Sequence, residues 1–238
     1  MKNRRIIVTG GSGRFGSYLK KNSIKHKFFF PSKKQLNILS EKNIYNYLKK
    51  AKADILIHLA GLSRPMNIHN RDIEKSINLN VIGTANITKV CSKLNIKLIY
   101  FSTNYVYPGK KGNYSETDPL LPVNNYAWSK LGGECSVMLY KNSLILRVCM
   151  TEKPFVHKKA FSNVKTSFIF HEEVVKILSK VLNKKGIINI GGKAQYIYNF
   201  AKKENKNIQK IILKKKSNIG IPIDSSLNLN KLNKIIKK

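Results

Sequence analysis

The chain has 238 residues, of which 45 are Lys or Arg and only 12 are Asp or Glu, so its formal net charge is +33. Apolar residues make up 42% of the chain, which is enough for a hydrophobic core. No apolar run reaches the ~20 residues of a membrane-spanning helix, and the chain opens without a signal-peptide pattern. A cytoplasmic protein without a membrane span is therefore expected.

The positive charge comes almost entirely from lysines spread along the whole chain. Dispersed lysines without interleaved aromatic platforms are a poor nucleic-acid footprint, so no specific nucleic-acid partner is predicted. The cysteines, Cys91, Cys135 and Cys149, match neither a metal-binding spacing nor a disulfide framework. We therefore expect reduced thiols and assign no metal.

Strand-like apolar runs alternate with helical patterns up to residue 150, which predicts an α/β fold with a Rossmann-type doubly wound parallel sheet. In chain order the expected elements are the strand Arg4–Val8, the helix Phe15–Asn22, the strand Lys27–Phe30, the helix Glu41–Lys50, the strand Asp54–Leu59, the helix Asp72–Leu94, the strand Lys97–Phe101, the loop Asn104–Asn125, the helix Tyr126–Leu139 and the strand Ser143–Val148.

The pattern changes after Val148, and Thr151–Lys165 is expected to be irregular. The elements predicted beyond it are an extended Phe168–Phe170, the helix Glu172–Leu182, the strand Ile187–Ile190, the helix Tyr196–Glu204, the strand Ile211–Leu213, a turn or linker at Lys214–Lys216 and the amphipathic helix Leu227–Ile236. We predict a dinucleotide-binding domain over 1–150 and a small substrate-binding region over 151–238, partly interleaved with the sheet.

The segment Thr9–Gly16, directly after the first strand, carries glycines with separate physical roles. Gly10 permits the tight turn, Gly13 allows the backbone to approach a pyrophosphate, and Gly16 allows the helix to pack closely on the strand. The helix N-terminus then directs its free N–H groups toward the phosphates. A P-loop is excluded because no Lys-Ser or Lys-Thr follows the last glycine.

Tyr126 and Lys130 are four residues apart in an expected helix, so they share one face. A phenol titrates near pH 10, and a neighbouring ammonium lowers its pKa toward the range that acid–base catalysis needs. Ser102 and Thr103 follow the fourth strand, where hydroxyls can hold a substrate oxygen. Of these two alternatives we prefer Thr103.

The end of the second strand bears on the choice of cofactor. NAD-selective folds place an acid about 20 residues past the glycine turn to hold the ribose 2′-hydroxyl. Here the sequence has Lys33 and Lys34 and no acid, and Arg14 adds a further cation. This favours NADP(H), with NAD(H) as the alternative. His58 and Trp128 are expected to be core residues.

These motifs resemble the extended short-chain dehydrogenase/reductases, in particular the dTDP-4-dehydrorhamnose reductase group of sugar-nucleotide enzymes. The resemblance covers about the first 150 residues and is looser beyond them. The segments that carry it are the Thr9–Gly16 turn, His58–Gly61, Asn80–Thr84, Phe101–Tyr107, the Tyr126–Lys130 pair and Leu146-Arg147.

The resemblance implies hydride reduction of the 4-keto group of a nucleotide-linked deoxysugar. Tyr126 would donate the proton, Lys130 would hold the nicotinamide ribose, and Thr103 would orient the carbonyl. Asn80 stands where related enzymes have a structural or proton-relay Asn. The other implied contacts are Gly10, Ser12, Gly13, Arg14, Phe15, Gly16, Asn37, Ala60, Gly61 and Ser102 for the cofactor, and Asn104, Tyr105 and Arg147 for the substrate. The implied partners are a nucleotide sugar and a second copy in a homodimer.

The sequence departs from that group at Asn104 and Asn37, where Asp is usual. Two alternatives therefore stay open. One is a sugar-nucleotide C4 epimerase of the same superfamily, which would keep NAD bound. The other is a non-catalytic regulatory subunit that binds the cofactor without turnover.

Overall fold

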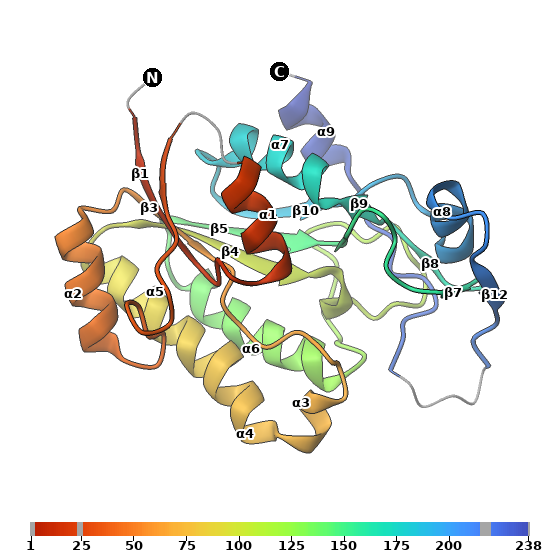
Figure 1. Ribbon diagram of the computed structural model, residues 1–238, viewed down its shortest axis with the longest axis horizontal. Helices are drawn as coiled ribbons and strands as arrows, with labels where there is room; N and C mark the ends of the chain where they lie inside the picture. Colours follow the sequence, from red (N-terminus) through yellow and green to blue (C-terminus); the bar gives the residue numbers. More distant parts are fainter. Residues whose placement is uncertain (1–2, 23–25, 215–219, 238) are drawn as a thin grey trace.

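A computed structural model describes residues 3–22, 26–214 and 220–237 (Figure 1). At its centre is a six-stranded sheet in the order β10-β5-β4-β3-β1-β2, in which every neighbouring pair is parallel. The strands are β1 (Arg5–Thr9), β2 (Lys27–Phe29), β3 (Ile55–His58), β4 (Lys97–Thr103), β5 (Ser143–Val148) and β10 (Gly186–Ile190). The predicted doubly wound parallel sheet is confirmed. Its strand order reverses between β1 and β3, and such sheets bind ligands at the carboxyl ends of the strands beside this reversal.

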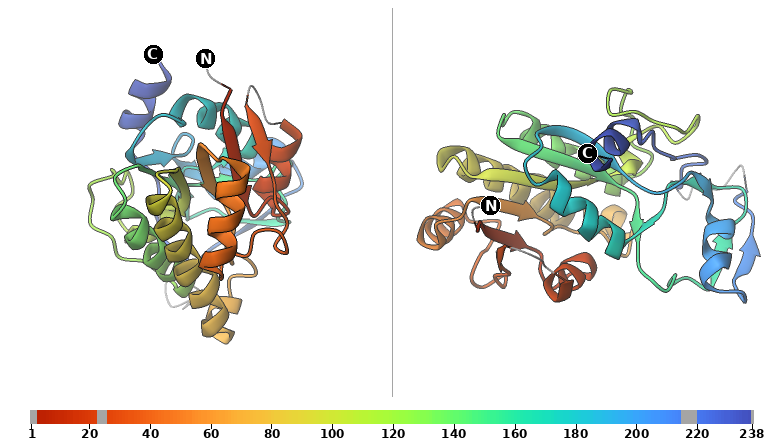
Figure 2. Two further views of the ribbon diagram at one scale, coloured as in Figure 1. Left: turned by 90° about the vertical axis from the view of Figure 1, so that its left-hand side faces the viewer. Right: turned by 90° about the horizontal axis from the view of Figure 1, so that it is seen from above.

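Helices cover both faces of the sheet (Figures 1 and 2). One face carries α1 (Arg14–Asn22), α7 (His171–Val181) and α9 (Asn230–Ile236), and the other carries α2 (Glu41–Ala51), α5 (Gly83–Lys93) and α6 (Asn125–Met138). Successive side chains of a strand point to opposite faces. Ile6 and Val8 therefore pack under the first layer, and Ile7 packs under the second. All three are fully buried.

The predicted helix over Asp72–Leu94 is not a continuous α-helix. It runs as α4 (Ile73–Ser76), a π-helical segment (Ile77–Ile82) and α5. π-Helical turns widen a helix locally and occur often at functional sites. Asn80 lies within this segment and is 1% exposed.

A small lobe follows β5 (Figure 1, right side). Its strands pair β7 (Lys159–Phe161) with β12 (Gln209–Ile211), β8 (Lys165–Thr166) with β11 (Gln195–Tyr196), and β6 (Met150–Thr151) with β9 (Ile169–Phe170). Together with α8 (Ile197–Glu204) they enclose a cluster that includes Phe155, Phe170 and Phe200. The expectation that Thr151–Lys165 is irregular was wrong for Thr151, for Lys159–Phe161 and for Lys165, which form short strands with partners distant in sequence, and the rest of the segment is irregular as expected.

Two further expectations need comment. Trp128 is 50% exposed instead of buried, because α6 turns Ala127 and Ser129 toward the interior. Lys215 and Lys216, from the predicted linker, lie outside the described residues. Within the described ranges, no helix combines the length and apolarity that crossing a bilayer requires.

Candidate active site

The glycine turn after β1 leaves no room for side chains at its first and last glycines. Gly10 has φ +72°, and a Cβ there would lie 2.5 Å from the backbone nitrogen of Ala60. A Cβ at Gly16 would collide with the Gly10 carbonyl oxygen, where α1 packs on β1. At Gly13 a Cβ would meet only that oxygen, at 3.2 Å. The turn is therefore tight beneath and open above, which suits a pyrophosphate at the N-terminus of α1.

The first residues of α1 divide between solvent and core. Ser12, Gly13 and Arg14 are exposed beside the open side of the turn. The Phe15 ring is 5% exposed and lies 5.2 Å from the Phe101 ring, centroid to centroid. Only the backbone of Phe15 is therefore free to face a ligand.

Asn80 connects the loop after β3 to α6. Its side-chain nitrogen donates to the Leu62 carbonyl and to the Ser129 hydroxyl, each at 2.8 Å, and its oxygen accepts from the Leu62 N–H at 2.6 Å. A Cβ on Gly61 would lie 2.7 Å from that oxygen. The arrangement makes Asn80 a positioning residue that fixes the Ala60–Leu62 loop against the helix that carries Tyr126.

Thr103 and Tyr126 meet at the carboxyl end of β4. The Thr103 hydroxyl lies close enough to the Tyr126 phenol to lower its pKa, and it accepts from the Tyr105 N–H at 3.3 Å. The Ser102 hydroxyl instead donates to Glu134 Oε2 at 2.5 Å. Of the two hydroxyls, Thr103 is therefore the one placed beside the phenol.

The electrostatics around Tyr126 differ from the expectation. Burial raises the pKa of its phenol, and the Thr103 hydroxyl and the Arg64 charge only partly oppose the rise. Burial also lowers the pKa of Lys130 to about 7, against the attraction of Glu134. The Lys130 ammonium lies 4.2 Å from the centroid of the Tyr100 ring. We expected Lys130 to make the phenol more acidic, whereas desolvation dominates and the positive charge acting on Tyr126 comes from Arg64.

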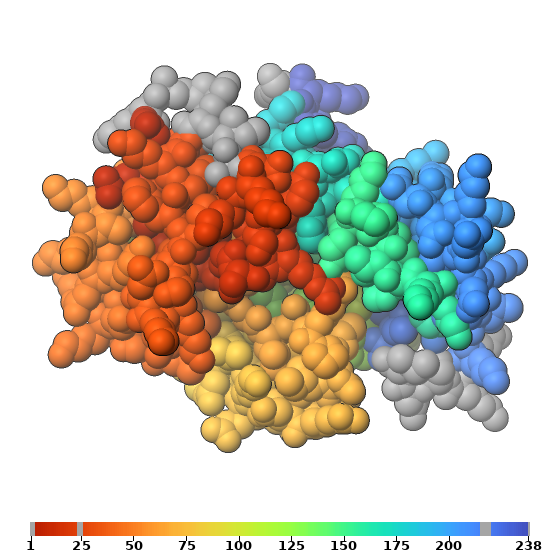
Figure 3. All heavy atoms as spheres, in the orientation of Figure 1, coloured from red at the N-terminus to blue at the C-terminus, as the bar shows by residue number. Residues whose placement is uncertain are grey.

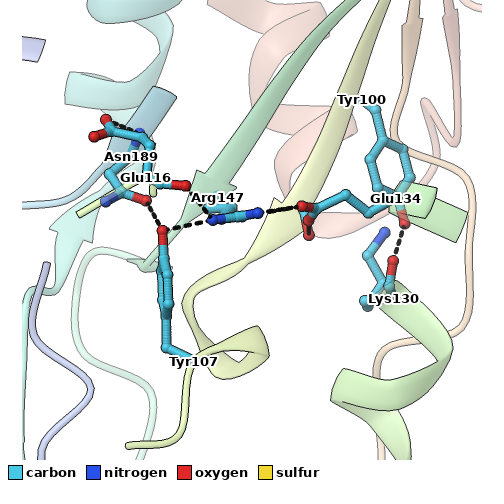
Figure 4. A network of polar contacts seen from close by, with 8 residues as sticks. Tyr100, Tyr107, Glu116, Lys130, Glu134, Arg147 and Asn189 are labelled. Carbon is cyan, nitrogen blue, oxygen red and sulfur yellow. Dashed lines mark hydrogen bonds and ion pairs between the residues drawn. The ribbon is translucent and has the colours of Figure 1, made fainter. Parts of the chain in front are cut away.

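Arg147 lies in a buried polar network instead of facing the crevice (Figure 4). Its guanidinium nitrogens Nε and Nη2 donate to Glu134 Oε1 at 3.0 and 2.6 Å, and its Nη1 donates to the Tyr107 hydroxyl at 2.8 Å. The Tyr107 hydroxyl in turn donates to Asn189 Oδ1 at 2.9 Å. The Arg147 side chain is 2% exposed and that of Glu134 is 0% exposed. A substrate role for Arg147 therefore does not fit, because its charge is already neutralised inside the protein.

Asn104 is also engaged internally. Its side chain is 3% exposed and donates to the Ser225 hydroxyl at 3.0 Å, so it connects β4 to the C-terminal segment. Tyr105 is half-buried, and burial raises the pKa of its phenol. Of these two expected substrate residues, only Tyr105 keeps a partly accessible side chain.

The residues expected to contact the adenosine part of the cofactor follow β2 in the chain. Lys33 and Lys34 are exposed in the turn after this strand. The side-chain oxygen of Asn37 accepts from the Leu39 N–H at 3.1 Å and so stabilises the local turn. The two lysines are therefore free to meet an anion, whereas Asn37 is partly committed.

His58 is the buried core residue that the sequence predicts. It is 0% exposed, and its ring nitrogens bond the Thr9 hydroxyl at 2.7 Å and the Thr84 hydroxyl at 3.2 Å. Burial lowers the pKa of His58 to about 3. Since the Thr9 hydroxyl also accepts from the Ala60 N–H, the neutral ring helps to fix the turn below the site.

Several residues at the site escaped the sequence reasoning. Glu152 accepts a hydrogen bond from Arg14 at 2.7 Å. The His69 ring is 1% exposed with its centroid 5.2 Å from that of Tyr126, and its Nε2 has no hydrogen-bond partner within the described part of the chain. For Glu134 the sequence did contain a usable pattern, because Tyr126, Lys130 and Glu134 follow at four-residue intervals and so share one helix face.

The sheet, the glycine turn and the Tyr126–Thr103 pair define the extended short-chain dehydrogenase/reductase class. Within that class, residues 4–174 match the family described as RmlD substrate binding domain, and the chain belongs to this family.

Curated relatives match somewhat more than half of the chain. Methionine adenosyltransferase 2 subunit beta of Pongo abelii is 28% identical over 145 residues, which is 57% of this chain and 43% of that protein. The dTDP-4-dehydrorhamnose reductase of Aggregatibacter actinomycetemcomitans is 26% identical over 152 residues, which is 62% of this chain and 51% of that protein. The matches span about half the length of these relatives.

Solved structures match nearly the whole chain. The dTDP-4-dehydrorhamnose reductase of Bacillus anthracis str. Ames, in complex with NADP, has a TM-score of 0.86 at 20% identity, covering 98% of this chain and 92% of that one. The Bordetella bronchiseptica enzyme WbmG, in complex with NAD and UDP, has a TM-score of 0.78 at 17% identity, covering 99% and 89%. At these identities the likeness establishes the shared fold.

Proposed function

We propose that the chain is a reductase of a nucleotide-linked 4-keto-6-deoxy sugar. The observation that carries the proposal is the position of the Thr103 hydroxyl close to the Tyr126 phenol, whose pKa it lowers, in a chain whose glycine turn is open to a pyrophosphate. Tyr126 donates its proton to the keto oxygen as that oxygen gains negative charge. Thr103 orients the substrate carbonyl toward the phenol. Lys130 lies one helical turn from Tyr126 and binds the nicotinamide ribose. A bound reduced nicotinamide supplies the hydride.

We propose NADP(H) as the preferred cofactor and NAD(H) as the alternative. The open glycine turn provides the pyrophosphate position, and Lys33 and Lys34 provide cations without a competing acid at the end of β2. The Bacillus anthracis structure in complex with NADP supports this choice, and the WbmG structure in complex with NAD keeps the alternative open. A nucleotide sugar as substrate and a second copy as partner remain part of this proposal.

The direct test replaces Tyr126 with Phe. NADPH oxidation is followed in the presence of a dTDP-linked 4-keto-6-deoxy sugar, and Tyr126→Phe is expected to lower the rate by about 100-fold or more, because the proton donor is lost. The rise in Tm with NADPH should persist, because the phenol oxygen does not build the pyrophosphate turn. Tyr47→Phe, on α2, is the matched control and should keep its activity. An unchanged rate in Tyr126→Phe contradicts the assignment.

A second candidate function is favoured by one comparison. The relatives named methionine adenosyltransferase 2 subunit beta are subunits by name, and that of Pongo abelii matches 57% of this chain. In this alternative the chain binds a nicotinamide cofactor and acts on another protein without turnover. A Tm that rises with NADPH, together with no turnover of dTDP- or UDP-linked keto sugars, would favour the subunit over the reductase.

A further inference from the structure

Two arginines from different parts of the chain converge on one carboxylate. Arg14 begins α1, and its Nη1 lies 2.7 Å from Glu152 Oε1. Arg64 follows β3, and its Nη1 lies 3.8 Å from the same oxygen. Glu152 directly follows β6. In Figure 3 the start of α1 (red), the segment after β3 (orange) and the segment after β6 (green) adjoin on one face.

The group carries a net positive charge. Two guanidinium ions share one carboxylate, in a chain with 45 basic and 12 acidic residues. The Glu152 side chain is 17% exposed, whereas those of Arg14 and Arg64 are 57% and 41% exposed. Burial alone would raise the pKa of Glu152, but hydrogen bonds from its own N–H and from Arg14, with the charge of Arg64, hold it below its ordinary value. The carboxylate is therefore ionised at neutral pH.

Both arginines lie at the proposed ligand site. Arg14 stands at the N-terminus of the helix that follows the open glycine turn, where a pyrophosphate is expected. The charge of Arg64 also lowers the pKa of Tyr126, so its guanidinium acts on the proposed proton donor as well as on Glu152. The pair therefore reaches from the turn toward the phenol.

We infer that Arg14 and Arg64 form a clamp for a diphosphate, and that Glu152 fills this clamp as an internal carboxylate which the ligand displaces. The inference deepens the proposed function and rests on it. A diphosphate brings more negative charge and more acceptor oxygens than a single carboxylate, and guanidinium forks bind phosphate oxygens in pairs. The diphosphate can belong to the dinucleotide cofactor or to the nucleotide sugar.

A cavity beside Glu152 can accept the displaced carboxylate. Beside Glu152 lies a cavity of about 260 Å³, whose lining also includes Lys21 and Lys153. Lys153 already pairs with Glu172 and Glu204, so Lys21 is the counter-ion for a carboxylate that turns into this cavity. Exchange of one anion for another is therefore possible without a change in the backbone.

The test measures Kd for NADPH, dTDP and inorganic pyrophosphate at fixed ionic strength, using the full chain. Glu152→Gln removes the competing charge and is expected to tighten binding about twofold to fivefold, the range of a partly exposed ion pair. Glu172→Gln is the matched control. Its carboxylate lines the same cavity but pairs with Lys153, at 3.9 Å, and should leave each Kd unchanged.

A second variant tests the clamp from the other side. Arg64→Gln should weaken binding of the same ligand by a similar factor, and Glu152→Gln should gain less in the Arg64→Gln background than in the wild type. An effect on NADPH alone assigns the clamp to the cofactor, and an effect on dTDP alone assigns it to the nucleotide sugar. Tm values of the free variants establish that they are folded.

The outcomes separate the clamp from the function. Binding of NADPH and dTDP to the wild type with an unchanged Kd in Glu152→Gln overturns the clamp and leaves the reductase proposal intact. Tighter pyrophosphate binding in Glu152→Gln, without any binding of NADPH, supports the clamp and overturns the reductase. Absence of binding by all three ligands overturns both.

Discussion

At the residue scale, the buried Glu134 links the proposed catalytic helix to the core. Its carboxylate accepts from Ser102 and Arg147, and its charge raises the pKa of Lys130, one helical turn away on α6. A charge that is 0% exposed is tolerated only when it is paired and hydrogen-bonded. Glu134 therefore holds α6 against β4 and β5 and also biases the charge of Lys130.

Replacement of Glu134 by Gln tests how much the buried carboxylate contributes to stability. The variant leaves the Arg147 guanidinium buried without its carboxylate, so the free energy of unfolding should fall by about 3–5 kcal/mol. Urea unfolding measures this change. Glu172→Gln removes a carboxylate that is 42% exposed and should cost less than about 1 kcal/mol. An equal loss of unfolding free energy in the two variants would show that the buried Glu134–Arg147 pair stabilises the fold no more than an exposed pair does.

The roles of single residues were the least predictable part of the sequence. Thr103 was preferred because it ends a strand, and Tyr126 was chosen because it shares a helix face with Lys130. In the structure the Thr103 hydroxyl lies close enough to the Tyr126 phenol to lower its pKa. Arg147 was expected at the substrate, yet its neighbour Glu134 comes from another element. Partners that are distant in sequence decide whether a charged side chain faces a ligand or the core, and periodicity carries no information about them.

At the element scale, the sheet was predictable because its strands are continuous apolar runs. β5 spans Ser143–Val148 as expected, and α2 begins at Glu41 as expected. In the small lobe, the extended Phe168–Phe170 coincides with β9 and the strand expected over Ile211–Leu213 overlaps the end of β12. The other short strands of this lobe were missed because two or three residues carry no period. The π-helical segment was missed because its apolar spacing resembles that of an α-helix over so short a length.

The contact between α6 and the π-helical segment depends on one glycine. A Cβ on Gly133 would collide with the Asn80 carbonyl oxygen and lie 2.8 Å from the Tyr100 hydroxyl. Gly133→Ala should therefore cost about 1–3 kcal/mol of unfolding free energy, because the helices must separate. At Gly132 a Cβ would lie 3.0 Å from a Val81 methyl carbon, which can move.

Gly132→Ala is consequently the control for that helix contact. The higher helix propensity of Ala contributes about 1 kcal/mol, which offsets the small adjustment of Val81. Denaturant midpoints of the two adjacent variants make the comparison. A Gly133→Ala protein as stable as Gly132→Ala would contradict the close packing.

At the scale of the whole molecule, buried histidines couple the fold to pH. Burial lowers the pKa of His58 from 6.5 to about 3, and it also lowers those of His69 and His171. The unfolded chain then binds protons more readily than the folded one. The stabilisation is complete above pH 6.5 and is lost as the pH falls from 6.5 toward 3.

His58 alone should contribute about 1.4 kcal/mol of lost stability per pH unit within that window. Unfolding free energies measured between neutral and mildly acidic pH give the slope. His58→Gln keeps a polar side chain but cannot take up the proton, so its slope should be shallower by about one proton. An identical slope in the variant would place the acid sensitivity elsewhere.

β10 forms one edge of the main sheet, but in the chain it comes after β6, β7, β8 and β9. β10 pairs with β5 along its full length, from Gly186 to Ile190. During synthesis on the ribosome, β5 therefore emerges with one row of peptide groups unpaired, and a bare strand edge of this kind recruits other chains. The main sheet is therefore complete only after β10 has been made, and a fragment truncated before β10 is expected to expose the edge of β5 and to aggregate.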